Sequence, residues 1–463
     1  MSQMPREVDY LVVGAGAMGM AFTDTILHES DATIALVDRL DRPGGHWNHA
    51  YPFVRLHQPS AYYGVNSRPL GENRLDASGR NAGMMELAGA HELLAYFDTV
   101  LRRDFLPCGR VSWYPQCTYL GDSSFRSAVT GETRHVKAGK VVDATYMNVQ
   151  VPKVTPPGFE VAEGVTCVPP NGLATVRQAY RGFVVVGAGK TAIDSCLYLL
   201  DLGVAPDRIT WIKPRESWLF DRAQMQPEGF SDHSILDYIL LQAQEIAAST
   251  SRADLFQRLE ACGALVRIEP DTEPTMFRCA TVSQAELADL RRIRNVVRLG
   301  RVQRLETTRM VLDQGEVAYR ADTLFIDCTA DGLEKRPTKP IFRDGRITLQ
   351  TVRPCQQLFA AAMIGHVECA YADEAQKNAL CVPVPHPDVT DDYLHMMRDI
   401  MRAQMAWAAD PGLFQWLVGS RLDGLTTPGF RALLEGSGPV PPEQIMDTVR
   451  RAIENLGRFM ESR

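Results

Sequence analysis

The feature that most constrains the fold is a glycine-rich turn between an apolar strand and a helix, which occurs twice. The first copy, DYLVVGAGAMG, spans residues 9–19 and contains the pattern Gly-x-Gly-x-x-Gly. In such a turn Gly14 permits the tight bend, Gly16 lets the backbone approach a pyrophosphate, and Gly19 lets the helix pack on the strand. The free N–H groups at the helix N-terminus attract the anion. The segment therefore predicts a dinucleotide-binding fold.

Two features downstream of this turn support the same interpretation. A second apolar strand at 33–37 ends in Asp38, which lies 22 residues after Gly16. A carboxylate at that distance is expected to accept hydrogen bonds from a ribose, the alternative being an ordinary surface acid. The loop DRPGGHW at 41–47 is too rich in glycine for a helix. We expect Gly45 and Trp47 to line the cofactor, and the alternative is a turn with a buried tryptophan.

The second copy of the motif is GFVVVGAGKTAID at residues 182–194. Its third glycine is replaced by alanine, which is tolerated because that position serves only close helix packing. We expect Gly187, Gly189, Lys190 and Thr191 to bind a second dinucleotide, with the threonine hydroxyl bonding a phosphate oxygen. One chain thus carries two dinucleotide-binding folds.

The strand that follows the second motif ends in basic residues where the first has an acid. Residues 208–212 lead into Lys213-Pro214-Arg215. Cations at this position match a ribose 2′-phosphate, whereas a carboxylate would repel it, so NADPH is favoured over NADH. The alternative is that Lys213 and Arg215 are solvated surface charges.

The order of the motifs predicts how the chain is divided. At 463 residues it exceeds the size of an ordinary single core. We expect an α/β fold with two Rossmann-like domains, the second inserted into the first. The expected boundaries are 1–150 for the first part of domain one, 151–320 for domain two with a helical insert at about 231–295, and 321–463 for the remainder of domain one.

Other segments fit this division. Residues 151–171 contain five prolines and suit a linker, with the matching return near 317–322, and 234–262 has helical periodicity. The apolar strand at 324–332 is expected to rejoin the first sheet, and Asp327 on it is a candidate cofactor-binding residue. The apolar segment 358–366 is expected to bring a helix N-terminus to the cofactor, and 441–463 to form an amphipathic helix.

Composition excludes several functional classes. A net charge of −7 offers no basic face to nucleic acid, and no apolar run approaches the length that crosses a bilayer. We expect a cytoplasmic protein acting on a small molecule, with its oligomeric state left open. The ten cysteines show no Cys-x-x-Cys or Cys/His cluster, which predicts reduced thiols without a metal or a redox disulfide.

Taken together, the segments resemble the class B flavin-dependent monooxygenases, the flavin-containing and Baeyer–Villiger enzymes. The resemblance rests on the two glycine motifs, the loop Gly44-Gly45-His46-Trp47, the stretch YPFVR at 51–55 and the stretch SAYYGVN at 60–66. It implies FAD on the first fold and NADPH on the second. The family also has a histidine-containing signature before the second motif, and GVTCV at 164–168 lacks it. The chain therefore resembles a divergent branch.

By this resemblance, NADPH would reduce FAD, and dioxygen would form a C4a-peroxyflavin that oxygenates a small organic substrate. Asn66 and Arg55 would be catalytic, donating hydrogen bonds near the flavin; the alternatives are that Asn66 caps a turn and Arg55 pairs with a carboxylate. A second hypothesis is a flavin dehydrogenase or reductase that passes electrons to an acceptor other than oxygen. A third is a non-catalytic binding protein, which has no need of the second glycine site.

Overall fold

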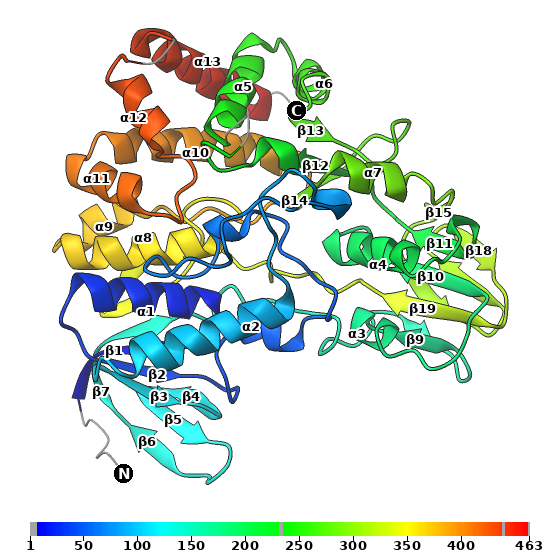
Figure 1. Ribbon diagram of the computed structural model, residues 1–463, viewed down its shortest axis with the longest axis horizontal. Coiled ribbons are helices and arrows are strands. Elements are labelled where there is room, and N and C mark those ends of the chain that lie inside the picture. Colours follow the sequence, from blue (N-terminus) through cyan, green and yellow to red (C-terminus); the bar gives the residue numbers. More distant parts are fainter. Residues whose placement is uncertain (1–6, 231–234, 438–439, 462–463) are drawn as a thin grey trace.

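Two sheets built mainly from parallel strands, each containing one glycine motif, form two parts of the molecule (Figure 1). The computed structural model describes residues 7–230, 235–437 and 440–461. The first sheet has the order β20-β21-β7-β1-β2-β3. Its strands are β1 (Glu7–Val13), β2 (Ile34–Val37), β3 (Val111–Tyr114), β7 (Lys137–Asp143), β20 (Phe342–Arg343) and β21 (Arg346–Thr348). All are parallel except β20, which pairs with β21 in the antiparallel sense.

The second sheet is entirely parallel and has the order β15-β11-β10-β19-β9. Its strands are β9 (Thr166–Val168), β10 (Gly182–Val186), β11 (Ile209–Ile212), β15 (Asn295–Val297) and β19 (Thr323–Asp327). The central strands read as continuous apolar runs because both faces are covered, one by helices and the other by a small sheet within residues 302–318. Each motif leads into a helix, α1 (Ala17–Glu29) in the first part and α4 (Lys190–Asp201) in the second. The predicted α/β class with two Rossmann-like folds is confirmed.

The chain returns to the first sheet later than expected. The prediction that 324–332 rejoins it is wrong, because β19 pairs with β10 and β9 in the second sheet. The return is made by β20 and β21, and β21 pairs with β7. These strands have two and three residues, too few to show a periodic pattern. The sequence of a buried parallel strand such as β19 is apolar throughout and does not indicate which of the two sheets the strand joins.

The insert between β11 and β15 contains the expected helices and also a small sheet. Its helices are α5 (Ile235–Ala248), α6 (Arg252–Ala261) and α7 (Gln284–Leu290). Its strands are β12 (Ser217–Asp221), β13 (Leu265–Val266) and β14 (Met276–Val282), in the order β13-β12-β14. Residues 231–234 of the predicted helical stretch lie outside the described residues. The insert is therefore mixed in structure, and β14 contributes to the site described below.

The C-terminal part is helical. It comprises α8 (Gln357–Ala370), α9 (Glu374–Leu380), α10 (Asp392–Ala408), α11 (Pro411–Gly419), α12 (Pro428–Leu434) and α13 (Pro442–Glu461). The amphipathic helix expected at 441–463 is confirmed as α13 over its described residues, with Ala452, Leu456 and Phe459 buried on one face. This helix packs on α5 and α10, so the insert and the C-terminal helices share one core (Figure 1).

Helix α8 lies alongside α1 (Figure 1). A Cβ on Gly365 would meet the Cβ of Thr25 at 3.0 Å, and His366 Nδ1 lies 2.6 Å from a carboxylate oxygen of Glu29. The apolar segment predicted at 358–366 therefore lies inside a helix, and its Gly-His end packs on α1.

The remaining elements include two small sheets, each of which packs on one face of a main sheet. They are α2 (Ala90–Thr99), α3 (Pro170–Leu173), the sheet of β4 (Cys117–Gly121), β5 (Ser124–Ser127) and β6 (Thr133–His135), and the sheet of β8 (Glu160–Val161), β16 (Val302–Leu305), β17 (Arg309–Leu312) and β18 (Gly315–Ala318). Within the described ranges, no helix combines the length and the apolar composition needed to cross a membrane.

Candidate functional site

A single cleft of about 1170 Å³ contains residues of both glycine motifs in its walls. Gly14 and Gly16 line it from the first part, and Gly187 and Gly189 from the second. Pockets for one small molecule commonly measure roughly 300 to 1,000 Å³. The cleft is thus large enough for more than one ligand, and the two motifs open into the same space.

The glycines of the first motif occupy three different environments. Gly14 has a φ of +102°, a conformation that favours glycine. A Cβ on Gly19 would lie 1.9 Å from the carbonyl oxygen of Gly14, so this residue must lack a side chain for α1 to pack on β1. A Cβ on Gly16 would meet only Gly45, at 3.7 Å from its Cα atom. The backbone at Gly16 is therefore open toward the cleft, at the N-terminus of α1.

Asp38, the residue predicted to accept hydrogen bonds from a ribose, lies beside the first glycine turn. It lines the cleft, and its carboxylate accepts hydrogen bonds from the backbone N–H groups of Ala15, at 2.6 Å, and Leu40, at 2.7 Å. Burial raises the pKa of Asp38 above its usual value, and these two bonds oppose that shift. The contact with Ala15 fixes the carboxylate against the glycine turn.

The aromatic loop after β2 closes over this turn. A Cβ on Gly45 would lie 2.9 Å from the Cα atom of Gly16, so the loop and the turn touch. Trp47 lines the cleft and donates from its indole N–H to the hydroxyl of Tyr63 at 2.8 Å. Burial lowers the pKa of the neighbouring His46 to about 4, so its imidazole is neutral near pH 7. Both predicted lining residues, Gly45 and Trp47, border the cleft.

The second motif repeats the division of roles. Gly187 has a φ of +135°, and a Cβ there would lie 2.7 Å from the carbonyl oxygen of Cys328. A Cβ on Gly189 would meet nothing within 4 Å. Gly189 therefore corresponds to Gly16 as the open position of its turn. Lys190 and Thr191, the two further candidates of this motif, line the cleft beside it.

A side-chain contact links the two motif-bearing parts across the cleft. Lys190 forms an ion pair with Asp194 one turn further along α4. The same carboxylate accepts a 2.7 Å hydrogen bond from the hydroxyl of Tyr51, which comes from the first part. Tyr51 and Lys190 both line the cleft. They mark the region where the two motif-bearing parts meet.

The two basic residues after β11 have different environments. Lys213 is 1% exposed, does not belong to the described lining of the cleft, and pairs with Glu216 at 2.7 Å. Burial lowers the pKa of Lys213, and the pairing with Glu216 opposes that shift. Arg215 does line the cleft. The structure thus brings only the second of the two predicted cations to the site.

Arg215 belongs to a cationic group that the sequence analysis missed. Arg215 at 3.3 Å, Arg278 at 2.7 Å and Lys335 at 2.7 Å all contact the carboxylate of Asp388. Burial opposes ionisation of Asp388, but the hydrogen bonds from Lys335 and Arg278 hold its pKa well below the usual value. Arg278 also pairs with Asp331 at 2.7 Å. Three cations facing two carboxylates leave one positive charge in excess at this wall.

The other sequence candidates lie at various distances from the cleft. Arg55 lines it, is exposed, and lies 3.7 Å from Asp76. Asn66 does not belong to the described lining, and its side-chain oxygen accepts a 3.0 Å hydrogen bond from Ser420. Asp327 is also outside the described lining and accepts hydrogen bonds from Thr329. The structure therefore places one of the two catalytic candidates at the cleft.

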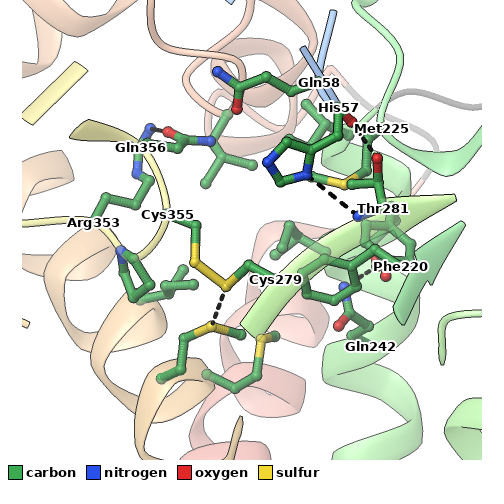
Figure 2. A pocket seen from close by; sticks show the side chains of 18 residues that line it. His57, Gln58, Phe220, Met225, Gln242, Cys279, Thr281, Arg353, Cys355 and Gln356 are labelled. Carbon is green, nitrogen blue, oxygen red and sulfur yellow. Dashed lines mark hydrogen bonds between the residues drawn. A yellow bond between two sulfur atoms is a disulfide. The ribbon is translucent and has the colours of Figure 1, made fainter. Parts of the chain in front are cut away.

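A smaller cavity of about 80 Å³ lies next to the cleft, between the insert and the C-terminal helices. Its walls are mainly apolar and include Tyr238, Met396 and Leu425. Phe220 and Met225, also in these walls, are labelled in Figure 2. Four residues, His57, Gln58, Cys279 and Cys355, line both the cavity and the cleft. We refer to these four residues as the partition.

The partition contains a disulfide between Cys279 and Cys355, whose Cα atoms are 6.4 Å apart (Figure 2). The prediction of ten reduced thiols is wrong for this pair and holds for the other eight, which are free in the described chain. Because 76 residues separate the two cysteines, their spacing carries no signal. The fold unites them by placing β14 beside the segment that precedes α8. Among the described residues, no group of side chains could hold a metal ion.

His57 is the titratable residue of the partition. Thr281 of β14 donates to it twice, from its backbone N–H to Nδ1 at 3.4 Å and from its hydroxyl to the His57 carbonyl oxygen. Burial, assisted by the charges of Lys190 and Arg222, lowers the pKa of His57 to about 3. The imidazole is therefore neutral near pH 7. Sequence reasoning missed His57 because no motif surrounds it.

No family model matches the chain. It is 52% identical over 417 residues to uncharacterized proteins of Mycobacterium tuberculosis and Mycobacterium bovis, covering 90% of this chain and 78% of each relative. The chain belongs to the same family as these mycobacterial proteins.

The chain is also structurally similar, over most of its length, to class B flavin monooxygenases. An open crystal structure of cyclohexanone monooxygenase matches 79% of this chain and 87% of its own, with 15% identity and a TM-score of 0.49. An oxidized steroid monooxygenase bound to NADP matches 78% and 84%, with 13% identity and a TM-score of 0.49. A flavin-containing monooxygenase from Stenotrophomonas maltophilia matches 82% and 100%, with 16% identity and a TM-score of 0.41.

Proposed function

We propose that the chain is an FAD-dependent, NADPH-using oxidoreductase, and specifically a monooxygenase that oxygenates a small organic substrate. The observation that carries this proposal is the pair of open glycines, Gly16 and Gly189, at two helix N-termini that share one cleft. Each position can admit a pyrophosphate against the backbone, where free N–H groups attract the anion. A binding protein for one dinucleotide would need only one such position.

FAD fits the first motif. The pyrophosphate would lie over Gly16, at the start of α1, and the ribose would reach Asp38. The Asp38 carboxylate already accepts two backbone bonds, and carboxylate oxygens have further lone pairs for ribose hydroxyls. Trp47 and Tyr63, joined by a hydrogen bond, would border the cofactor. The glycine and acidic side chain therefore suit a flavin dinucleotide.

NADPH fits the second motif. Its pyrophosphate would lie over Gly189, at the start of α4, with Thr191 as a hydrogen-bond donor. Arg215, Arg278 and Lys335 provide excess positive charge in the same cleft, which matches a ribose 2′-phosphate. NADH lacks the 2′-phosphate that would pair with this charge.

The bound cofactors would supply hydride transfer and the activation of dioxygen, and the chain would supply position and environment. Tyr51 and Lys190, held by Asp194, would fix the two motif-bearing parts where the reacting rings meet. The neutral His57 can exchange hydrogen bonds there without bringing a charge. The apolar cavity behind the partition would hold a compact, apolar substrate. Such a cavity excludes water, which protects reactive intermediates.

The test separates oxygenation from plain electron transfer. Protein loaded with FAD is reduced anaerobically with NADPH, freed of excess nicotinamide and mixed with dioxygen, while dioxygen uptake and hydrogen peroxide release are followed together. A monooxygenase should take up dioxygen before it releases peroxide, because the cleft retains the activated oxygen for the substrate. Simultaneous uptake and release would contradict oxygenation.

A second candidate function is an NAD(P)H-dependent flavin reductase that passes electrons to an acceptor other than oxygen. The observation that favours it is the disulfide in the cleft wall, which is itself a two-electron acceptor. Simultaneous dioxygen uptake and peroxide release in the same experiment would support this alternative.

A further inference from the structure

We propose that the Cys279–Cys355 disulfide is a redox-active group that accepts two electrons delivered to the cleft by NADPH. This proposal rests on the binding of flavin and NADPH proposed above, and it is independent of whether dioxygen also reacts. Both cysteines line the cleft as well as the apolar cavity behind it. A disulfide that served only to hold the fold together would have no need of a place in this wall.

The position of Cys355 brings the disulfide to the flavin side of the cleft. Cys355 lies in the turn that leads into α8, and Gln357 and Leu358, the first residues of that helix, line the cleft. Helix α8 runs alongside α1, which begins at the open glycine of the first motif. Residues at the N-termini of both helices, Gly16 and Gln357, therefore line the same cleft, and Cys355 lies two residues before α8.

The position of Cys279 brings the disulfide to the nicotinamide side. In the pairing of β12 with β14, Trp218 faces Phe277 and Phe220 faces Thr281, so β14 carries extra residues and Cys279 lies in the resulting bulge. Bulges re-aim side chains and are common next to active sites. Thr281, two residues further on, holds His57, whose pKa reflects the charge of Lys190 in the second motif. The disulfide thus belongs to the wall of the cleft into which both motifs open.

The backbone at both cysteines is unusual. Cys279 has a φ of +55° and Cys355 a φ of +63°, and they are two of eight described residues other than glycine with positive φ. Side chains rarely adopt this conformation, and such residues cluster at functional sites. Here the two conformations turn the sulfur atoms toward each other across the partition (Figure 2).

In the proposed step, one NADPH and one proton reduce one disulfide, giving NADP⁺ and two thiols. The S–S bond breaks, its sulfur atoms take up two electrons by way of the flavin, and the two S–H groups receive one proton equivalent from the transferred hydride and one from solvent. Reduction also releases the covalent tie between β14 and the segment before α8. Cys355 is then the more accessible thiol and lies at a helix N-terminus, which favours its thiolate.

The experiment is an anaerobic titration of the FAD-loaded protein with NADPH, followed by alkylation and mass spectrometry of each cysteine. Wild type should consume two equivalents of NADPH per flavin, and Cys279 and Cys355 should become alkylated only after NADPH is added. Cys279→Ser and Cys355→Ser should each consume one equivalent. Cys108→Ser is the matched control because Cys108 is a free, exposed thiol, and it should behave as wild type.

The outcomes separate the two proposals. Flavin that bleaches with one equivalent of NADPH, while both cysteines stay protected from alkylation, would overturn the redox role of the disulfide and leave the proposed function intact. Flavin that does not bleach with NADPH would overturn the proposed function together with this electron path. The alkylation pattern of wild type decides the question even if a serine variant fails to fold.

Discussion

The substitution Gly16→Val should abolish FAD binding and leave the fold intact. The backbone of Gly16 is extended, with a φ of −69°, so valine can adopt it without strain. A Cβ there meets only Gly45, at an ordinary distance of 3.7 Å, and the rest of the side chain must project toward the cleft. It would occupy the space where a pyrophosphate approaches the N–H groups of α1.

The size of the effect follows from the lost contacts. Each hydrogen bond to a charged group contributes about 1.5 to 3 kcal/mol, and we expect displacement of the pyrophosphate to remove about two of them. We expect FAD to bind at least about 100-fold more weakly, which corresponds to roughly 2.7 kcal/mol. The assay is the flavin content of purified protein after dialysis against FAD, with the unfolding temperature of the apoprotein as the measure of the fold.

Two matched variants define the controls. Gly189→Val alters the equivalent open position of the second motif and should retain FAD while losing NADPH. Gly19→Ala should instead destabilise the protein, because its Cβ would lie 1.9 Å from a carbonyl oxygen. Full flavin content in Gly16→Val would refute the assignment of the first motif.

Three further predictions concern the residues around the cleft. Arg215→Ala should weaken NADPH binding by about 1 to 2 kcal/mol, roughly 5- to 30-fold, and leave NADH binding unchanged. The measurement is the dissociation constant of each nucleotide, and an equal loss of affinity for both would contradict the cationic site. Lys213→Ala should act on stability instead, lowering the unfolding free energy by about 1 to 3 kcal/mol because Glu216 would keep only Arg298 as an ion-pair partner, while NADPH affinity per folded protein stays unchanged. The pKa of His57 is about 3 in the folded protein and 6.5 in the unfolded chain, so the unfolded chain binds more protons between these pH values. The free energy of unfolding should therefore fall as the pH drops from about 6.5 toward 3. His57→Gln should flatten this pH dependence in denaturant titrations, and an unchanged slope would contradict the prediction.

The fold and the glycine turns could be predicted because their signals are local. A strand, a glycine turn and a helix occupy neighbouring residues, and the roles of Gly14, Gly16 and Gly19 follow from the backbone alone. Asp38 was equally accessible, because it ends the strand that must follow the helix. In the structure it touches the turn that its spacing indicated.

The rest of the site depends on contacts between distant segments. Arg278, Lys335 and Asp388 come from three parts of the chain and have no common motif, so the cationic wall has no sequence signature. The disulfide joins residues 76 apart in the same way. For Lys213 the sequence signal was present but ambiguous. A basic residue at the end of a strand gives the same sequence pattern whether it faces a ligand or, as here, a buried glutamate.

We propose that NADPH and FAD meet in one cleft and exchange a hydride there. The most direct measurement is the rate of flavin bleaching when FAD-loaded protein is mixed anaerobically with NADPH, unlabelled or carrying deuterium at the transferred position. We expect bleaching that saturates with NADPH concentration, slows with deuterium, and needs a higher concentration of NADH. Flavin that stays oxidised with both nucleotides, yet is reduced at once by dithionite, would contradict the account.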